Sequence, residues 1–147
     1  MPHPPNFVPI LAGAIFMPFM VQRSLGIFVP LIVMLLSDII IGLHGLMIWT
    51  YGSLVLITLL SYKTIEKNFI SVLKLASVSP IIFFLLTNFG VWLSSTIYSP
   101  DLAGLINSYL MGLPFLANSL ISTILFSSCF YAIYHSLNLK SKLESNL

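Results

Sequence analysis

The chain has 147 residues, of which 58% are hydrophobic and 7% charged, and its formal net charge at pH 7 is +2. Soluble domains carry roughly 25% charged residues, so a soluble fold of this length could not bury the apolar surface that this composition implies. The six Lys and Arg residues are too few and too scattered to follow nucleic-acid phosphates, and the single cysteine, Cys129, excludes an internal disulfide and a cysteine-rich metal site.

Six apolar blocks, separated by short polar stretches, predict one transmembrane domain over residues 1–147. In chain order the blocks cover residues 7–20, 25–41, 46–62, 69–93, 102–113 and 114–134. Lipid offers the backbone no hydrogen-bond partners, and continuous apolar runs without alternation favour helices over a closed barrel. We therefore expect an all-α, polytopic protein that contacts the lipid bilayer as a bundle of about six short transmembrane helices.

Prolines interrupt these blocks and predict bent helices. Pro9, Pro18, Pro30, Pro80 and Pro114 lie within apolar blocks or at their edges, where each removes one backbone donor. Proline is also commoner in membrane helices than in soluble ones, which is the simpler explanation for any single position. We expect Pro114 to begin the last helix.

Two lysine-containing segments give conflicting predictions of orientation. Lys63 and Lys67 lie in the polar loop after the third block, with Lys74 close behind them, and Lys140 and Lys142 lie in the C-terminal tail. The positive-inside rule assigns both segments to the cytoplasm, whereas three spans between them would place them on opposite sides. Either residues 102–113 do not cross the membrane or the tail dominates. The second alternative, with six spans and both termini cytoplasmic, is our expectation.

Four runs of residues carry a resemblance to a known family. They are Asn6-Phe7-Val8-Pro9, Pro30-Leu31-Ile32-Val33-Met34-Leu35-Leu36-Ser37-Asp38 with Gly42-Leu43-His44, Thr87-Asn88-Phe89-Gly90-Val91-Trp92, and Leu113-Pro114-Phe115-Leu116-Ala117-Asn118-Ser119. Together they resemble an uncharacterised family of small bacterial inner-membrane proteins, over nearly the whole chain. The resemblance implies a multi-pass protein of the bacterial inner (cytoplasmic) membrane and assigns no chemistry.

More distantly, that family is similar to the substrate-binding S components of energy-coupling factor (ECF) vitamin transporters. This similarity implies a six-helix, S-component-like bundle with a ligand pocket near the outer face, and membrane partner subunits that energise uptake. S components commonly carry a small-x-x-x-small pattern on the first helix for docking to those subunits. Here Ala12 is followed four positions later by Phe16, and Gly13 by Met17, so the sequence departs from the docking pattern.

Asp38 is the only acidic residue inside an apolar block. A charged Asp near the centre of a membrane helix costs roughly 2.5 to 3.5 kcal/mol on insertion scales, so its position is informative. His44 follows the break at Gly42 and could fold back to Asp38. The pair is then either a proton-responsive or ligand-contacting site, or a polar anchor of the turn at residues 42–45.

Asn88 and Trp92 form a second candidate site, because residues four apart share one face of a helix. An amide beside a large ring is the chemistry of a pocket for a planar polar ligand. Asn107, Tyr109 and Asn118 would join that pocket if the last three helices meet there. The alternatives are an interhelical hydrogen bond by Asn88 and an interfacial position for Trp92.

Enzyme motifs are missing from the sequence: it has no glycine-rich phosphate loop, no H-E-x-x-H and no G-x-S-x-G. We therefore expect no enzymatic activity, cofactor, metal site or nucleic-acid partner. The leading hypothesis is the binding or uptake of a small, vitamin- or cofactor-like molecule, with six candidate ligand contacts: Asp38, His44, Asn88, Trp92, Asn107 and Asn118. The alternative is a structural or assembly subunit of a larger membrane complex, and an intramembrane enzyme is a third hypothesis.

Overall fold

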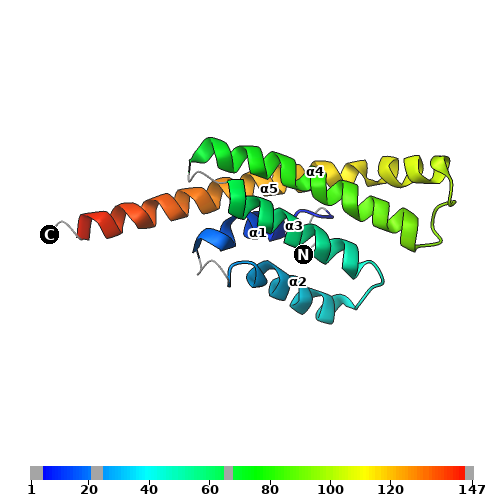
Figure 1. The fold of residues 1–147 in the computed structure, drawn as a ribbon. Coiled ribbons are helices and arrows are strands. Elements are labelled where there is room, and N and C mark those ends of the chain that lie inside the picture. Colours follow the sequence, from blue (N-terminus) through cyan, green and yellow to red (C-terminus); the bar gives the residue numbers. More distant parts are fainter. Residues whose placement is uncertain (1–4, 21–24, 65–67, 145–147) are drawn as a thin grey trace.

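A computed structural model describes residues 5–20, 25–64 and 68–144, and every regular element in these ranges is an α-helix (Figure 1). The helices are α1 (Ile10–Met20), α2 (Phe28–Ile41), α3 (Met47–Thr64), α4 (Phe69–Ser94) and α5 (Leu102–Glu144). Each of the first four predicted blocks corresponds to one helix. The prediction of an all-α chain is confirmed.

The fifth and sixth predicted blocks, residues 102–113 and 114–134, form one helix, so six separate spans are not supported. α5 runs without interruption over 43 residues, and Pro114 lies inside it instead of beginning a new helix. A proline removes one backbone donor, but neighbouring helices can hold the flanking turns in place. Here Gly112 packs directly against Asn88 and Phe84 of α4, so the turn that precedes Pro114 is fixed by tertiary contact.

Side-chain and backbone caps define where the helices begin and end. The Ser71 N–H donates to Asn68 Oδ1 at 2.8 Å, which caps the start of α4, and the Gly104 N–H donates to Asp101 Oδ1 at 2.7 Å at the start of α5. α2 ends at Gly42, whose φ of 124° is one that other residues rarely adopt. The Gly42 N–H donates to the Asp38 carbonyl oxygen at 2.8 Å.

α4 and α5 form a long antiparallel hairpin, and α1, α2 and α3 lie along one side of it (Figure 1). α1 packs against all four other helices, whereas α2 packs against α1 and α3 and not directly against the hairpin. The buried core consists of apolar residues of α1, α3 and α4: Leu11, Ala14, Ile15, Phe16, Leu54, Ile57, Val72, Leu75 and Ala76. α1 therefore lies at the centre of the packing.

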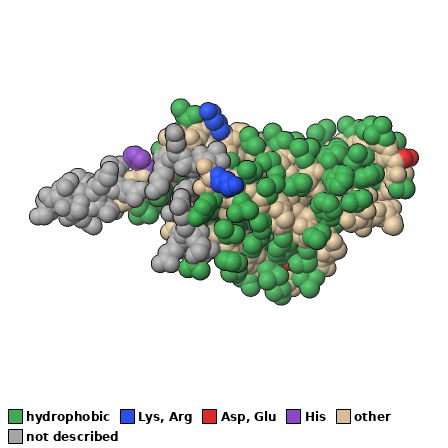
Figure 2. Space-filling view, viewed as in Figure 1, with side chains coloured by type: hydrophobic (Ala, Val, Ile, Leu, Met, Phe, Trp, Pro, Cys, Tyr) green, Lys and Arg blue, Asp and Glu red, His purple; other side chains and the backbone are tan. Residues whose placement is uncertain are grey.

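Large apolar side chains cover the outside of the helices (Figure 2). The most exposed are Ile40 and Ile41 at the end of α2, with 85% and 82% of their surface accessible. Within the described residues, two helices are long and apolar enough to cross a membrane: α4, and the Leu102–Leu137 part of α5. The shorter α2 is apolar as well, apart from Ser37 and Asp38.

Charged residues lie toward opposite ends of the hairpin. The Phe69 ring at the start of α4 contacts the Tyr131 ring of α5, with centroids 5.3 Å apart, so the first turns of α4 lie beside the later part of α5. Lys63, in the last turn of α3, lies at this end, from which the C-terminal part of α5 projects (Figure 1). Asp101 lies in the connection at the other end. Because α5 is one helix, its C-terminal part, with Lys140 and Lys142, lies toward the same end as Lys63, whereas Lys67 lies outside the described residues.

Candidate ligand-binding site

The predicted proximity of Asp38 and His44 is present at the turn between α2 and α3. The Asp38 side chain is buried, and His44 Nε2 lies 3.8 Å from its Oδ1 atom. The Tyr51 hydroxyl, near the start of α3, donates a 2.7 Å hydrogen bond to Asp38 Oδ2. The Tyr51 hydrogen bond offsets part of the cost of burying the carboxyl group, and it joins α3 to α2. We refer to Asp38, His44 and Tyr51 as the Asp38 clasp.

Sequence analysis did not identify Tyr51. No periodicity relates α2 to α3, and the only signal is that a buried carboxylate needs a donor. Three hydroxyls lie near the start of α3, but Thr50 and Ser53 donate to carbonyl oxygens of their own helix at 3.4 and 2.6 Å. Tyr51 has the longest of these three side chains, so its hydroxyl is the one that can reach Asp38 on the neighbouring helix.

Asn88 and Trp92 share one face of α4 but make different contacts. Asn88 Nδ2 donates to the Phe84 carbonyl oxygen one turn earlier at 2.9 Å, and its Oδ1 atom lies against Gly112 of α5. The Trp92 indole N–H donates to the Ser99 carbonyl oxygen at 3.0 Å, which ties the end of α4 to the following loop. Of the two, only Asn88 lines a cavity described below.

The remaining predicted contacts lie apart from one another on α5. Asn107 is exposed. The Tyr109 hydroxyl donates to the Leu85 carbonyl oxygen of α4 at 3.1 Å. Asn118 Nδ2 donates to the Pro5 carbonyl oxygen at 2.9 Å, which fixes the segment before α1 against the middle of the apolar part of α5. The six predicted ligand contacts therefore do not converge on one cavity.

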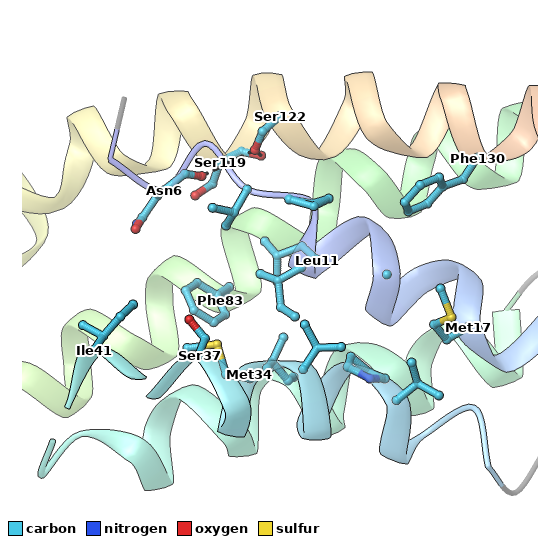
Figure 3. Close-up of a pocket in the computed structure, with 18 residues that line it drawn as sticks. Asn6, Leu11, Met17, Met34, Ser37, Ile41, Phe83, Ser119, Ser122 and Phe130 are labelled. Carbon is cyan, nitrogen blue, oxygen red and sulfur yellow. Dashed lines mark hydrogen bonds between the residues drawn. The ribbon is translucent and has the colours of Figure 1, made fainter. Parts of the chain in front are cut away.

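One cavity lies between α1, α2, α4 and α5, and we refer to it as the apolar cavity (Figure 3). Its volume is about 580 Å³. Fourteen of the 18 residues that line it are apolar or glycine, and the four polar ones are Asn6, Ser37, Ser119 and Ser122. Figure 3 shows Asn6, Ser119 and Ser122 together on the α5 side of the cavity. Such a space suits an apolar molecule with few hydrogen-bonding groups.

A second cavity of about 580 Å³ follows the α4–α5 hairpin, and we refer to it as the hairpin cavity. It is more polar, because Asn6, Thr87, Asn88, Tyr98 and Ser119 are among the 14 residues that line it. Neither cavity is lined by a Lys, Arg, His, Asp or Glu residue. Within the described part of the chain, no three His, Cys, Asp or Glu side chains lie close enough together to hold a metal ion.

Residues 5–9, which are not helical, lie against the middle of α5. The Ser122 hydroxyl is 3.5 Å from the Asn6 carbonyl oxygen that it faces, and the Phe7 and Phe126 rings meet edge to face with centroids 6.0 Å apart. Asn6, Val8 and Pro9 line the apolar cavity. Residues 5–9 were not among the predicted ligand contacts, because their single polar side chain, Asn6, lies at the edge of the first apolar block.

Comparison with known proteins yields one match. The model of a family of unknown function, DUF6580, matches residues 1–145. No curated protein and no solved structure matches the chain. The prediction of a family without assigned chemistry is confirmed, and the match does not bear on the similarity to S components.

Proposed function

This chain belongs to the DUF6580 family of unknown function, and we propose that it is a multi-pass protein of the cytoplasmic membrane that binds a small, largely apolar molecule in the apolar cavity. The observation that carries this proposal is a cavity of about 580 Å³ beside a non-helical segment in the middle of the bundle. Ligand pockets typically measure ~300 to 1,000 Å³.

The membrane location is supported by the outer surface of the helices. Soluble monomers rarely expose contiguous apolar patches larger than a few hundred Å². Here exposed large apolar residues are found on all five described helices, among them Met20, Ile40, Ile48, Val78 and Ile121. Hydrocarbon chains stabilise such a surface, the 26 residues of α4 can cross a bilayer, and the 36 residues of Leu102–Leu137 are more than one crossing needs.

Orientation follows from the lysines. The positive-inside rule places the end of the bundle that carries Lys63 in the cytoplasm, and the Asp101 end outside. In a Cys129→Ser background, a membrane-impermeant maleimide should label Asp101→Cys on intact cells and Lys63→Cys only after permeabilisation. Labelling of both positions from one side would contradict this orientation.

The segment before α1 supports a binding role. Irregular backbone at membrane depth is tolerated only where it is buried in protein or lines a cavity. Pro5 and Asn6 are held by Asn118 and Ser122 near the midpoint of the apolar part of α5. The non-helical segment therefore borders the apolar cavity, through Asn6, Val8 and Pro9, instead of extending α1, and this arrangement supports a binding role.

The structural-subunit hypothesis retains one supporting observation. Asp38 and Asn118 each pair with groups of a neighbouring segment instead of turning toward a shared cavity. Polar groups that only join helices are what a purely structural bundle requires. The two functions differ in whether the apolar cavity accepts a ligand.

The test compares the same substitution at two glycines, one that lines the apolar cavity and one on the outer surface. A Cβ atom at Gly13, which lines the apolar cavity, or at Gly52, on the exposed side of α3, would meet no atom within 4 Å. Gly13→Leu should therefore narrow the cavity without strain, and Gly52→Leu should add the same side chain to the outer surface. Both proteins are reconstituted in nanodiscs and irradiated with a diazirine-bearing hexadecane, and the labelled peptides are mapped by mass spectrometry.

Labelling should occur at Phe83 and Phe130 in the wild type and in Gly52→Leu, and should be reduced there in Gly13→Leu. Labelling around Ile40, on the outer surface, should persist in all three proteins and serves as the internal control. If the wild type is labelled only on its outer surface, the binding function is wrong and the structural subunit is favoured.

A further inference from the structure

The two cavities share part of their walls. Asn6, Phe83 and Ser119 line both the apolar cavity and the hairpin cavity. These residues come from three segments far apart in the sequence: the stretch before α1, the middle of α4 and the middle of α5. The two spaces therefore lie next to each other where three parts of the chain converge.

Asn6 has an unusual conformation at this junction. Its φ of 61° is the only positive φ of a non-glycine residue among those the structure describes. Asn tolerates this left-handed conformation better than most residues. Sparsely populated backbone conformations persist where surrounding contacts hold them, and they concentrate at ligand-binding sites. Here Asn118 and Ser122 hold the backbone on either side of the Asn6 side chain.

The polar groups around the hairpin cavity are all uncharged. The amides of Asn6 and Asn88 can donate and accept hydrogen bonds, and so can the hydroxyls of Tyr98 and Ser119. One Asn88 N–H is used within α4, which leaves the other N–H and the carbonyl oxygen. A charged group would find no opposite charge among the lining residues, and burying an unpaired charge is far costlier than burying a hydroxyl.

From these observations we propose that the ligand is a neutral amphiphile that occupies both cavities, an inference that rests on the binding function proposed above. Its apolar chain lies in the apolar cavity, and its uncharged, hydrogen-bonding head lies in the hairpin cavity beside Asn6 and Asn88. Long-chain alcohols and other lipids with hydroxyl or carbonyl heads belong to this class. Fatty acids and phospholipids, whose heads are charged, do not.

The experiment compares three probes that differ only at the head. Diazirine-bearing hexadecane, hexadecanol and hexadecanoic acid are presented to the full chain in nanodiscs at pH 8, where the acid is ionised. Labelling at Phe83, which lines both cavities, is compared with labelling around Ile40 on the outer surface. Hexadecanol should label Phe83 about tenfold more efficiently than hexadecanoic acid, whose carboxylate meets no opposite charge, and more efficiently than hexadecane, which can make no hydrogen bond.

Asn6→Gly tests the role of the amide without straining the backbone, because glycine adopts positive φ readily. This variant should lose the preference for hexadecanol over hexadecane at Phe83. Asn107→Ala, at an exposed position on α5, should behave as the wild type.

Equal labelling of Phe83 by all three probes would overturn the neutral-amphiphile proposal and leave the apolar binding function intact. A preference for hexadecanoic acid, or a preference for the alcohol that survives in Asn6→Gly, would overturn it as well. Absence of Phe83 labelling by every probe would instead contradict the binding function itself, so the two failures are distinguishable.

Discussion

The α4–α5 hairpin and the region around α2 differ in how closely their helices pack. In the hairpin, Gly112 lets α5 approach so closely that an added Cβ atom would lie 2.5 Å from Asn88 Oδ1 and 2.8 Å from Phe84 Cε2. α2 has two buried residues, Pro30 and Asp38, and the apolar cavity separates part of it from α1 and the hairpin.

The difference shows two ways of holding apolar helices together. In lipid, apolar side chains gain little by leaving hydrocarbon for protein, so association depends on close packing and interhelical hydrogen bonds. The hairpin relies mainly on close packing at glycine. α2 relies on the Asp38 clasp at its C-terminal end, which leaves its remaining length free to border a cavity.

The largest effect is expected from Gly112→Leu. The added side chain cannot fit between α5 and the Asn88 and Phe84 side chains, so we expect a loss of about 3 kcal/mol in the free energy of unfolding. Gly52→Leu adds the same side chain to α3 where an added Cβ meets no atom within 4 Å, and should be close to neutral. Denaturant unfolding in detergent measures both, and equal stability of the two variants would refute close packing as the stabilising factor.

A smaller effect is expected at the Asp38 clasp. Asp38→Ala and Tyr51→Phe each remove one side of the 2.7 Å hydrogen bond, and a double-mutant cycle should give a coupling free energy of about 1 to 2 kcal/mol. Hydrogen exchange should show that both variants loosen α2 and leave α4 and α5 protected. Additive single mutants would mean that the hydrogen bond does not hold α2 in place.

The smallest effect is expected at the start of α5. Hydrogen bonds from the Gly104 N–H and the Ser99 hydroxyl hold the pKa of Asp101 below its ordinary value of 3.8. A carboxylate whose pKa is lower in the folded protein stabilises it above the unfolded pKa and loses that contribution as the pH falls through the folded pKa. The melting temperature should therefore decrease slightly as the pH falls from 5 to 3, because this range contains the ordinary Asp pKa of 3.8.

Asp101→Asn isolates this contribution, because asparagine also caps helices but does not titrate. As the pH falls below 4, close to the ordinary Asp pKa of 3.8, the melting temperature should decrease less in the variant than in the wild type. An identical pH dependence of the two proteins would show that the charge of Asp101 does not stabilise α5.

Composition and local pattern determined the all-α class and the first four helices, because an apolar run bounded by polar residues already specifies a helix that can be buried in lipid. They also placed Asp38 near His44, since the Gly42 break requires the chain to turn there and the two residues are close in sequence. These features depend on interactions within a short stretch of chain.

Tertiary structure alone decided the rest. Whether Pro114 begins a new helix or lies inside a longer one was decided where Gly112 packs against α4, and the single helix α5 brings its C-terminal part to the same end of the bundle as Lys63. The choice of Tyr51 as the partner of Asp38, and the convergence of Asn6, Phe83 and Ser119 between two cavities, join residues from different helices. No periodicity within one helix encodes such contacts, because they are fixed by how closely whole helices approach one another.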